Sequence, residues 1–138
     1  MALATGLTSI DQQLPGLILI VEDDPIIGEL LHSLIAEEGF RPLGPVGSLT
    51  EGKSAIAEHA LAAALVDIRL GRDERSFELA EILRALRIPF AFMSAYPSLL
   101  TPPKFRDVQL LRKPFTGEEL ASLLHQLVES HSNTTRRP

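Results

Sequence analysis

The stretch Leu17-Ile18-Leu19-Ile20-Val21-Glu22-Asp23-Asp24-Pro25 decides the fold that the rest of the sequence must fit. Residues 17–21 form an unbroken apolar run, which is typical of a parallel strand buried on both faces. Glu22 and Asp23 follow at once, and Asp24 with Pro25 has the form of a helix cap with proline at the first helical position. A buried strand that passes through acids into a capped helix indicates the start of an α/β unit.

The same alternation of strand and helix continues through the chain after this stretch. Apolar residues recur at helical spacing from Ile26 to Ile35, and Gly39 marks the end of that helix. Further strands are expected at residues 41–46, 62–66, 89–93 and 108–111, and further helices at residues 48–59, 77–86 and 116–128. Because Pro42 and Pro45 interrupt the second strand, we expect it at an edge of the sheet.

This alternation predicts a doubly wound α/β fold, with a five-stranded parallel sheet and helices on both faces. Residues 69–75 are expected to form a charged loop, and the proline-rich segment 97–104 a short irregular helix. Residues 1–16 are expected to be an N-terminal arm, residues 17–129 the domain itself, and residues 130–138 a polar disordered tail. With so short a tail, no separate output domain is expected in the chain.

The composition of the 138 residues excludes several classes of function. There is no cysteine, which excludes disulfides, thiol catalysis and zinc sites built on thiolates. With 13 basic and 18 acidic residues the formal net charge is -5, which argues against a nucleic-acid-binding domain. The apolar runs are too short to span a membrane, and the first residues lack the basic start of a secretory signal. We therefore expect a cytoplasmic protein that binds neither nucleic acid nor membrane.

Polar residues with complementary chemistry stand at the ends of the predicted strands. Glu22 and Asp23 follow the first strand, Asp67 ends the third, Ser94 follows the fourth and Lys113 follows the fifth. The carboxyl ends of parallel strands meet at one edge of the sheet, where α/β proteins of this kind carry their chemistry. We therefore expect these side chains to form a single site.

The residue types at this edge favour phosphoryl transfer. Three carboxylates make an all-oxygen site suited to Mg²⁺, with water completing the octahedron. Asp67 can act as a carboxylate nucleophile toward phosphorus. The hydroxyl of Ser94 and the ammonium of Lys113 can hold the oxygens of the transferred group. Such a reaction needs mainly in-line positioning and charge neutralisation, and this set provides both.

Together these motifs resemble the receiver domain of bacterial response regulators. The resemblance rests on residues 17–25, the strand that ends at Asp67, Ser94-Ala95 and Lys113-Pro114-Phe115, and it extends from about Gly16 to Glu129. It implies a flavodoxin-like receiver fold and a phosphoacceptor role. A sensor histidine kinase or a phosphotransfer protein would supply the phosphoryl group, and a downstream protein target would read it out. The chain would not be an enzyme beyond its own phosphotransfer and autodephosphorylation, and would be a monomer or weak dimer.

The resemblance also implies a role for each residue of the site. Asp67 would be the phosphoacceptor, Asp23 a direct Mg²⁺ ligand and Glu22 a member of the same acid pocket. The backbone carbonyl of Arg69 would be a further metal ligand. Ser94 and Lys113 would bind the phosphoryl group, and the peptide bond between Lys113 and Pro114 would be cis.

A narrower resemblance lies in residues 89–96. This run is similar to the signature of a variant receiver class of alphaproteobacteria, whose members are often single-domain regulators served by histidine kinases of the HWE or related types. Ordinary receivers carry an aromatic switch residue three positions before the lysine, where this chain has Leu110. Tyr96 is a candidate substitute for it.

Other interpretations stay open on the sequence alone. A Mg²⁺-dependent phosphatase of the haloacid-dehalogenase type would need a second Asp two positions after Asp67, where the chain has Arg69. A phosphate sink or relay, or a receiver-like interaction module that is never phosphorylated, fits the same residues. The arginines at 69, 72 and 75 form a basic cluster near the site, either as a solvated loop or as a contact for the kinase.

Overall fold

A computed structural model of the chain describes residues 16–95 and 101–136, with side chains up to residue 130. Its main sheet has five strands in the order β2-β1-β3-β6-β7, and each pairs in parallel with its neighbours. The strands are β1 (Leu17–Val21), β2 (Arg41–Val46), β3 (Ala63–Asp67), β6 (Phe90–Ser94) and β7 (Leu110–Arg112). The predicted five-stranded parallel sheet is confirmed, with β2 at an edge as expected, and this order is the flavodoxin-like one.

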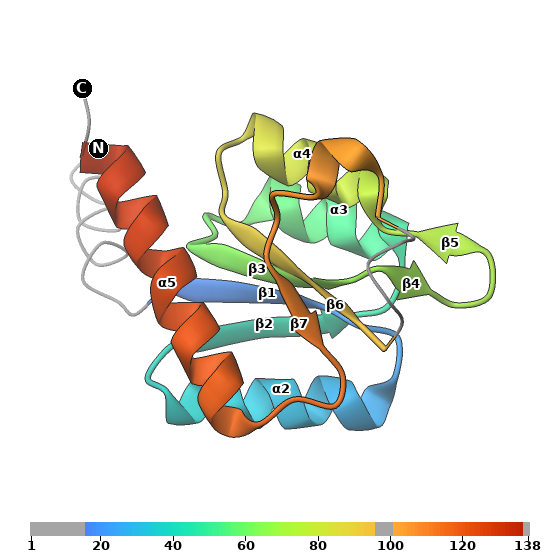
Figure 1. The fold of residues 1–138 in the computed structure, drawn as a ribbon, viewed down its shortest axis with the longest axis horizontal. Helices are drawn as coiled ribbons and strands as arrows, with labels where there is room; N and C mark the ends of the chain where they lie inside the picture. Colours follow the sequence, from blue (N-terminus) through green and yellow to red (C-terminus); the bar gives the residue numbers. More distant parts are fainter. Residues whose placement is uncertain (1–15, 96–100, 137–138) are drawn as a thin grey trace.

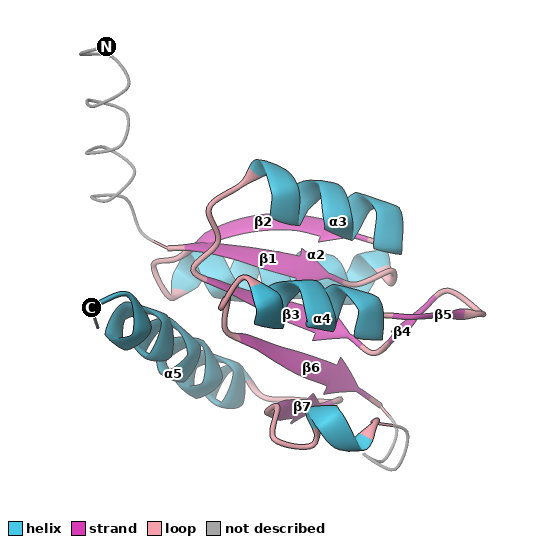
Figure 2. Ribbon diagram, turned by 90° about the horizontal axis from the view of Figure 1, so that it is seen from above, coloured by secondary structure: helices cyan, strands magenta, loops and turns pink. Residues whose placement is uncertain are grey.

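Helices cover both faces of the sheet (Figures 1 and 2). They are α2 (Pro25–Glu37), α3 (Leu49–Glu58), α4 (Phe77–Ala85) and α5 (Gly117–Arg136). Ile18 and Ile20 of β1 pack in the cluster under α2 and α5, whereas Leu19 and Val21 pack in the cluster under α3 and α4. All four of these side chains are fully buried, which is why the sequence of β1 is apolar without alternation.

Side-chain caps set where α2 and α5 begin, and so how short the loops before these two helices are. The Asp24 carboxylate accepts hydrogen bonds from the backbone N–H groups of Ile26 and Ile27, at 2.9 and 3.4 Å, and Pro25 opens the helix. Thr116 and Glu119 form the predicted reciprocal capping box of α5. Because α2 begins at Pro25, Glu22 and Asp23 are held directly at the end of β1.

Two expectations about irregular segments are wrong. Residues 69–75 are not a plain loop: β4 (Arg69–Leu70) and β5 (Glu74–Arg75) form an antiparallel hairpin, turned by Gly71 at φ 64°. The polar tail predicted from Ser130 continues α5 as far as Arg136 instead. Residues 118–137 contain no proline or glycine, so the sequence has no helix-breaking residue at Ser130, where the tail was expected to begin.

The segment before β7 is only partly described. Residues 97–100 of the expected irregular helix and residues 1–15 of the expected arm lie outside the described residues, as does Tyr96. Within the described part, a 3-10 helix, η2 (Pro103–Phe105), leads into β7. Among the described helices, none combines the length and apolar character needed to cross a membrane.

Candidate functional site

The predicted site residues lie around one hollow of about 350 Å³ at the carboxyl edge of the sheet. The strand order places β1 beside β3 and β6 beside β3 and β7, so their ends converge there. The hollow is lined by Glu22, Asp23, Asp24, Ile27, Asp67, Arg69, Gly71, Ser94, Ala95 and Lys113. All six residues predicted from the sequence are therefore brought together.

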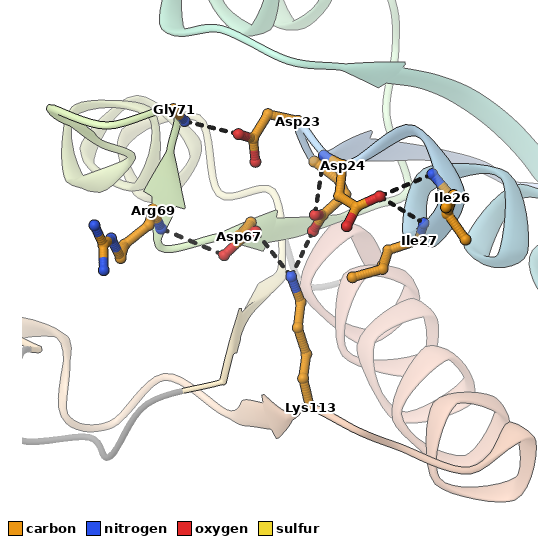
Figure 3. A network of polar contacts seen from close by, with 9 residues as sticks. Asp23, Asp24, Ile26, Ile27, Asp67, Arg69, Gly71 and Lys113 are labelled. Atoms are coloured by element: carbon orange, nitrogen blue, oxygen red, sulfur yellow. Dashed lines mark hydrogen bonds and ion pairs between the residues drawn. The ribbon is translucent and has the colours of Figure 1, made fainter.

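Lys113 connects the ends of the strands (Figure 3). Its Nζ donates to Glu22 Oε2 at 2.8 Å and to Asp67 Oδ2 at 2.9 Å. Its backbone N–H donates to the carbonyl oxygen of Ser94 at 2.9 Å, which ties the segment after β7 to the end of β6. The Lys113–Pro114 peptide bond is cis, as the resemblance implied.

The carboxylates of Glu22, Asp23 and Asp67 lie close enough to share a cation, with one oxygen of each within 4.8 Å of the others. Burial, and next the hydrogen bond with Asp67, raise the pKa of Glu22 to about 7 although Lys113 opposes the shift. For Lys113, burial alone would lower the pKa, but its bonds to Glu22 and Asp67 outweigh burial and raise it. Folding thus favours the protonated form of the Glu22 carboxyl and the charged form of the Lys113 ammonium.

The hairpin after β3 supplies backbone donors to the same carboxylates. The N–H of Gly71 donates to Asp23 Oδ2 at 2.9 Å, and the N–H of Arg69 donates to Asp67 Oδ1 at 3.3 Å (Figure 3). Sequence reasoning missed Gly71, although a glycine inside a charged segment is a signal for a turn with positive φ. It also gave Asp24 only a capping role, whereas Asp24 lines the hollow as well.

The donor set fits a hard divalent cation. Every residue of the cluster offers carboxylate oxygen, which Mg²⁺ prefers, and no cysteine exists in the chain to favour a softer metal. A cation here would replace the proton that the raised pKa of Glu22 would otherwise retain. The residues present therefore fit the metal that the resemblance implies.

Leu110 does not fill the space beside it as a large ring would. A second hollow, of about 330 Å³, lies between η2 and β7 and is lined by Phe92, Thr101, Phe105, Arg106, Val108 and Leu110. Ser94 is buried at 5% exposure and lines the hollow of the site. The candidate substitute Tyr96 lies outside the described residues.

Comparison with known proteins gives related regulators, although no family model matches the chain. SdrG of Pseudomonas melonis, solved in its BeF3-activated conformation, is 33% identical with a TM-score of 0.71; the match covers 81% of this chain and 95% of SdrG. The phyllosphere-induced regulator PhyR of Methylorubrum extorquens is 28% identical, over 87% of this chain and 46% of PhyR. The receiver domain of the sensor histidine kinase PA1611 of Pseudomonas aeruginosa, solved with magnesium in its active-site cleft, is 22% identical with a TM-score of 0.70 over 83% of this chain and 98% of that domain.

The chain belongs to the family of response regulator receiver domains of two-component systems. It is similar to SdrG over nearly the whole of that protein. It spans about half the length of PhyR and of the second curated relative, the regulatory protein YbdJ of Bacillus subtilis.

Proposed function

We propose that this chain is a phosphoacceptor switch that takes a phosphoryl group onto Asp67 from a sensor histidine kinase or a phosphotransfer protein. The observation that carries the proposal is the pairing of Lys113 Nζ with Asp67 and Glu22, at 2.9 and 2.8 Å, inside a pocket that also holds Asp23. A nucleophilic carboxylate beside a lysine and a divalent-cation site is the arrangement that phosphoryl transfer requires.

The step itself moves one group between two nucleophiles. An Asp67 carboxylate oxygen attacks phosphorus in line, an O–P bond forms, and the N–P bond of the donor phosphohistidine breaks with its electron pair returning to the imidazole. Mg²⁺, held by Glu22, Asp23, Asp67 and the carbonyl oxygen of Arg69, would neutralise charge on the transferred oxygens. Lys113 would form an ion pair with one of these oxygens, and Ser94 would donate a hydrogen bond to another.

Output would follow from the new charge on Asp67. A phosphoryl group adds about two negative charges, which draws Ser94 and Lys113 toward it and so shifts the ends of β6 and β7. Because Leu110 borders a hollow rather than filling it with a ring, the segment through η2 has space to move. A partner protein that docks on the face formed by η2, β7 and α5 would read this change.

A phosphate sink or relay is the second candidate. It is favoured by Leu110, because the aromatic residue that couples the hydroxyl to the output face in ordinary receivers is replaced. Amide exchange with and without beryllofluoride separates the two functions. Protection changes that extend to residues 101–112 support the switch, and changes confined to the hollow of the site support the sink.

Labelling with a small phosphodonor tests the acceptor directly. With Mg²⁺ and acetyl phosphate, wild-type protein should gain one phosphoryl group in a form labile to hydroxylamine, as an acyl phosphate is. Asp67→Asn should gain none, and Asp23→Asn should gain none because the cation no longer binds. Stoichiometric labelling of Asp67→Asn would refute the assignment.

A further inference from the structure

The carboxylate of Asp23 is held differently from the other two acids of the candidate cation site. Glu22 and Asp67 are buried, and each accepts a hydrogen bond from Lys113, at 2.8 and 2.9 Å. Asp23 is exposed. Within the described residues, the donor to its side chain is the backbone N–H of Gly71, which lies 2.9 Å from Oδ2 (Figure 3). The orientation of the Asp23 carboxylate therefore depends on one backbone group in this part of the chain.

Gly71 is itself held in place by the β4–β5 hairpin, which projects beside the site (Figures 1 and 2). The side chain of Leu70 is 1% exposed and packs in the core cluster under α3 and α4. The N–H of Ser76 donates to the carbonyl oxygen of Ile68 at 3.0 Å, which closes the base of the hairpin. The N–H of Gly71 thus reaches Asp23 from a turn that is anchored to the domain on both sides.

The turn requires a left-handed backbone at position 71. Gly71 has φ 64°, which glycine adopts readily and which residues with a Cβ adopt rarely. Apart from the adjoining residues, no described atom lies within 4 Å of the place that a Cβ would take there. A larger residue therefore meets strain in the backbone rather than a steric clash, so a substitution changes the turn without disturbing the packing around it.

We propose that Gly71 is a positioning residue of the cation site, because its N–H fixes the Asp23 carboxylate in the orientation that a divalent cation requires. This inference rests on the proposed function, which needs that cation beside Asp67. An oxygen of Asp23 already lies within 4.8 Å of oxygens of Glu22 and Asp67, so a carboxylate held in this way binds without first losing rotational freedom. Loss of a group that orients a metal ligand typically weakens metal binding by about 10–100-fold.

The cation should in turn stabilise the turn of the hairpin. If the hydrogen bond from Gly71 raises the affinity of the site for Mg²⁺, then Mg²⁺ must favour the bonded turn by the same factor, because coupling between two equilibria is reciprocal. Each strand of the hairpin has only two residues, so strand pairing by itself holds the turn weakly. Exchange of the Gly71 amide hydrogen should therefore respond to binding of the cation.

The test compares three variants, Gly71→Ala, Gly71→Asn and Gly39→Ala. Alanine strains the left-handed backbone at position 71, whereas asparagine tolerates it and should keep the bond to Asp23. Gly39 is the matched control, since it also has a positive φ, 89°, and open space at its Cβ position, but it follows α2 at the end away from the site. Calorimetric titration with Mg²⁺ gives the affinity of each variant, and thermal melting without metal gives its stability.

We expect Gly71→Ala to weaken Mg²⁺ binding about ten-fold, and Gly71→Asn and Gly39→Ala to stay within about three-fold of wild type. Both alanine variants should have a lower melting temperature, because each carries a strained backbone, so a loss of stability alone does not account for the difference in affinity. In the wild-type chain, saturating Mg²⁺ should slow hydrogen exchange of the Gly71 amide by about ten-fold, as the reciprocal coupling requires.

Several outcomes would overturn the inference. They are a wild-type affinity for Mg²⁺ in Gly71→Ala, an equal loss of affinity in Gly39→Ala or in Gly71→Asn, or exchange of the Gly71 amide that Mg²⁺ leaves unchanged. Each of these leaves the proposed function standing, provided that the wild-type chain binds Mg²⁺. If the wild-type chain binds no Mg²⁺, the cation site of the proposed function fails, and the inference fails with it.

Discussion

Two regions of this domain place their charged groups differently. They are the acid pocket at the carboxyl edge of the sheet and the aromatic cluster of Phe77, Phe90, Phe92 and Phe105. In the pocket, Glu22 and Asp67 are buried and Lys113 contacts both. Around the cluster, Arg84 and Lys104 lie over the Phe105 ring and pair with the exposed acids Asp107 and Glu81. We therefore expect the buried charges of the pocket to determine its affinity for a cation and its dependence on pH. The exposed charges around the cluster lie over apolar packing and should contribute little to stability.

The largest expected effect comes from breaking the packing of the cluster. Phe92 is 1% exposed, and its ring centroid lies 5.5–5.7 Å from those of Phe77, Phe90 and Phe105. Phe92→Ala should lower the free energy of unfolding by about 3–4 kcal/mol, because it leaves a cavity among these rings. Chemical denaturation with and without Mg²⁺ should give the same loss, and a loss that Mg²⁺ repairs would contradict the separation of the two regions.

Removing the lysine ammonium from the pocket should lower the free energy of unfolding by less than Phe92→Ala does, and the loss should depend on Mg²⁺. Lys113→Met leaves Glu22 and Asp67 buried without their ammonium partner, which should lower the free energy of unfolding by about 2–3 kcal/mol at neutral pH without metal. Mg²⁺ should restore part of this loss, since a divalent cation replaces the missing charge. Denaturation curves that Mg²⁺ leaves unchanged would show that the carboxylates do not bind it.

The pH dependence of stability tests the raised pKa of Glu22. The carboxyl ionises near 4.5 when unfolded and near 7 when folded, so the folded state holds the extra proton between these values. In the metal-free protein, the proton on Glu22 should therefore stabilise the fold fully below about pH 4.5. As the pH rises to about 7, the free energy of unfolding should fall by about 2–3 kcal/mol. In Glu22→Gln that slope should be absent. Equal slopes in both proteins would mean that Glu22 does not retain its proton.

The smallest effect belongs to the exposed charges of the aromatic region. Asp107→Ala removes the carboxylate that accepts from Arg84 at 3.0 and 3.1 Å, but the side chains of Arg84 and Asp107 are 42% and 74% exposed. The free energy of unfolding should fall by less than about 1 kcal/mol, and the loss should vanish at high salt. If the free energy of unfolding fell as much as in Lys113→Met, the exposed charges would matter as much as the buried ones, and the contrast between the two regions would be wrong.

The strand ends show how far the chain itself specifies the site. Each parallel strand must present its last residue at the same edge, so the apolar runs that define the strands also placed Asp67, Ser94 and Lys113 together. The caps at Asp24 and Thr116 were equally readable, because they depend on residues within a few positions of one another. These features are local, and local chemistry suffices to predict them.

The hairpin could not be read in the same way. Its charged residues look like solvated loop, and it forms because Leu70 is drawn into the core while Gly71 donates to Asp23, a residue far away in the sequence. The raised pKa of Glu22 is of the same kind, since burial and contact with Asp67 create it. The order of residues was enough to bring Glu22, Asp23, Asp67, Arg69, Ser94 and Lys113 to one edge, because the periodicity of strands and helices is local, but it did not show that Asp24 also lines the hollow. How the charges of those side chains interact was settled only by folding, because burial and hydrogen bonds between distant segments exist only in the folded chain.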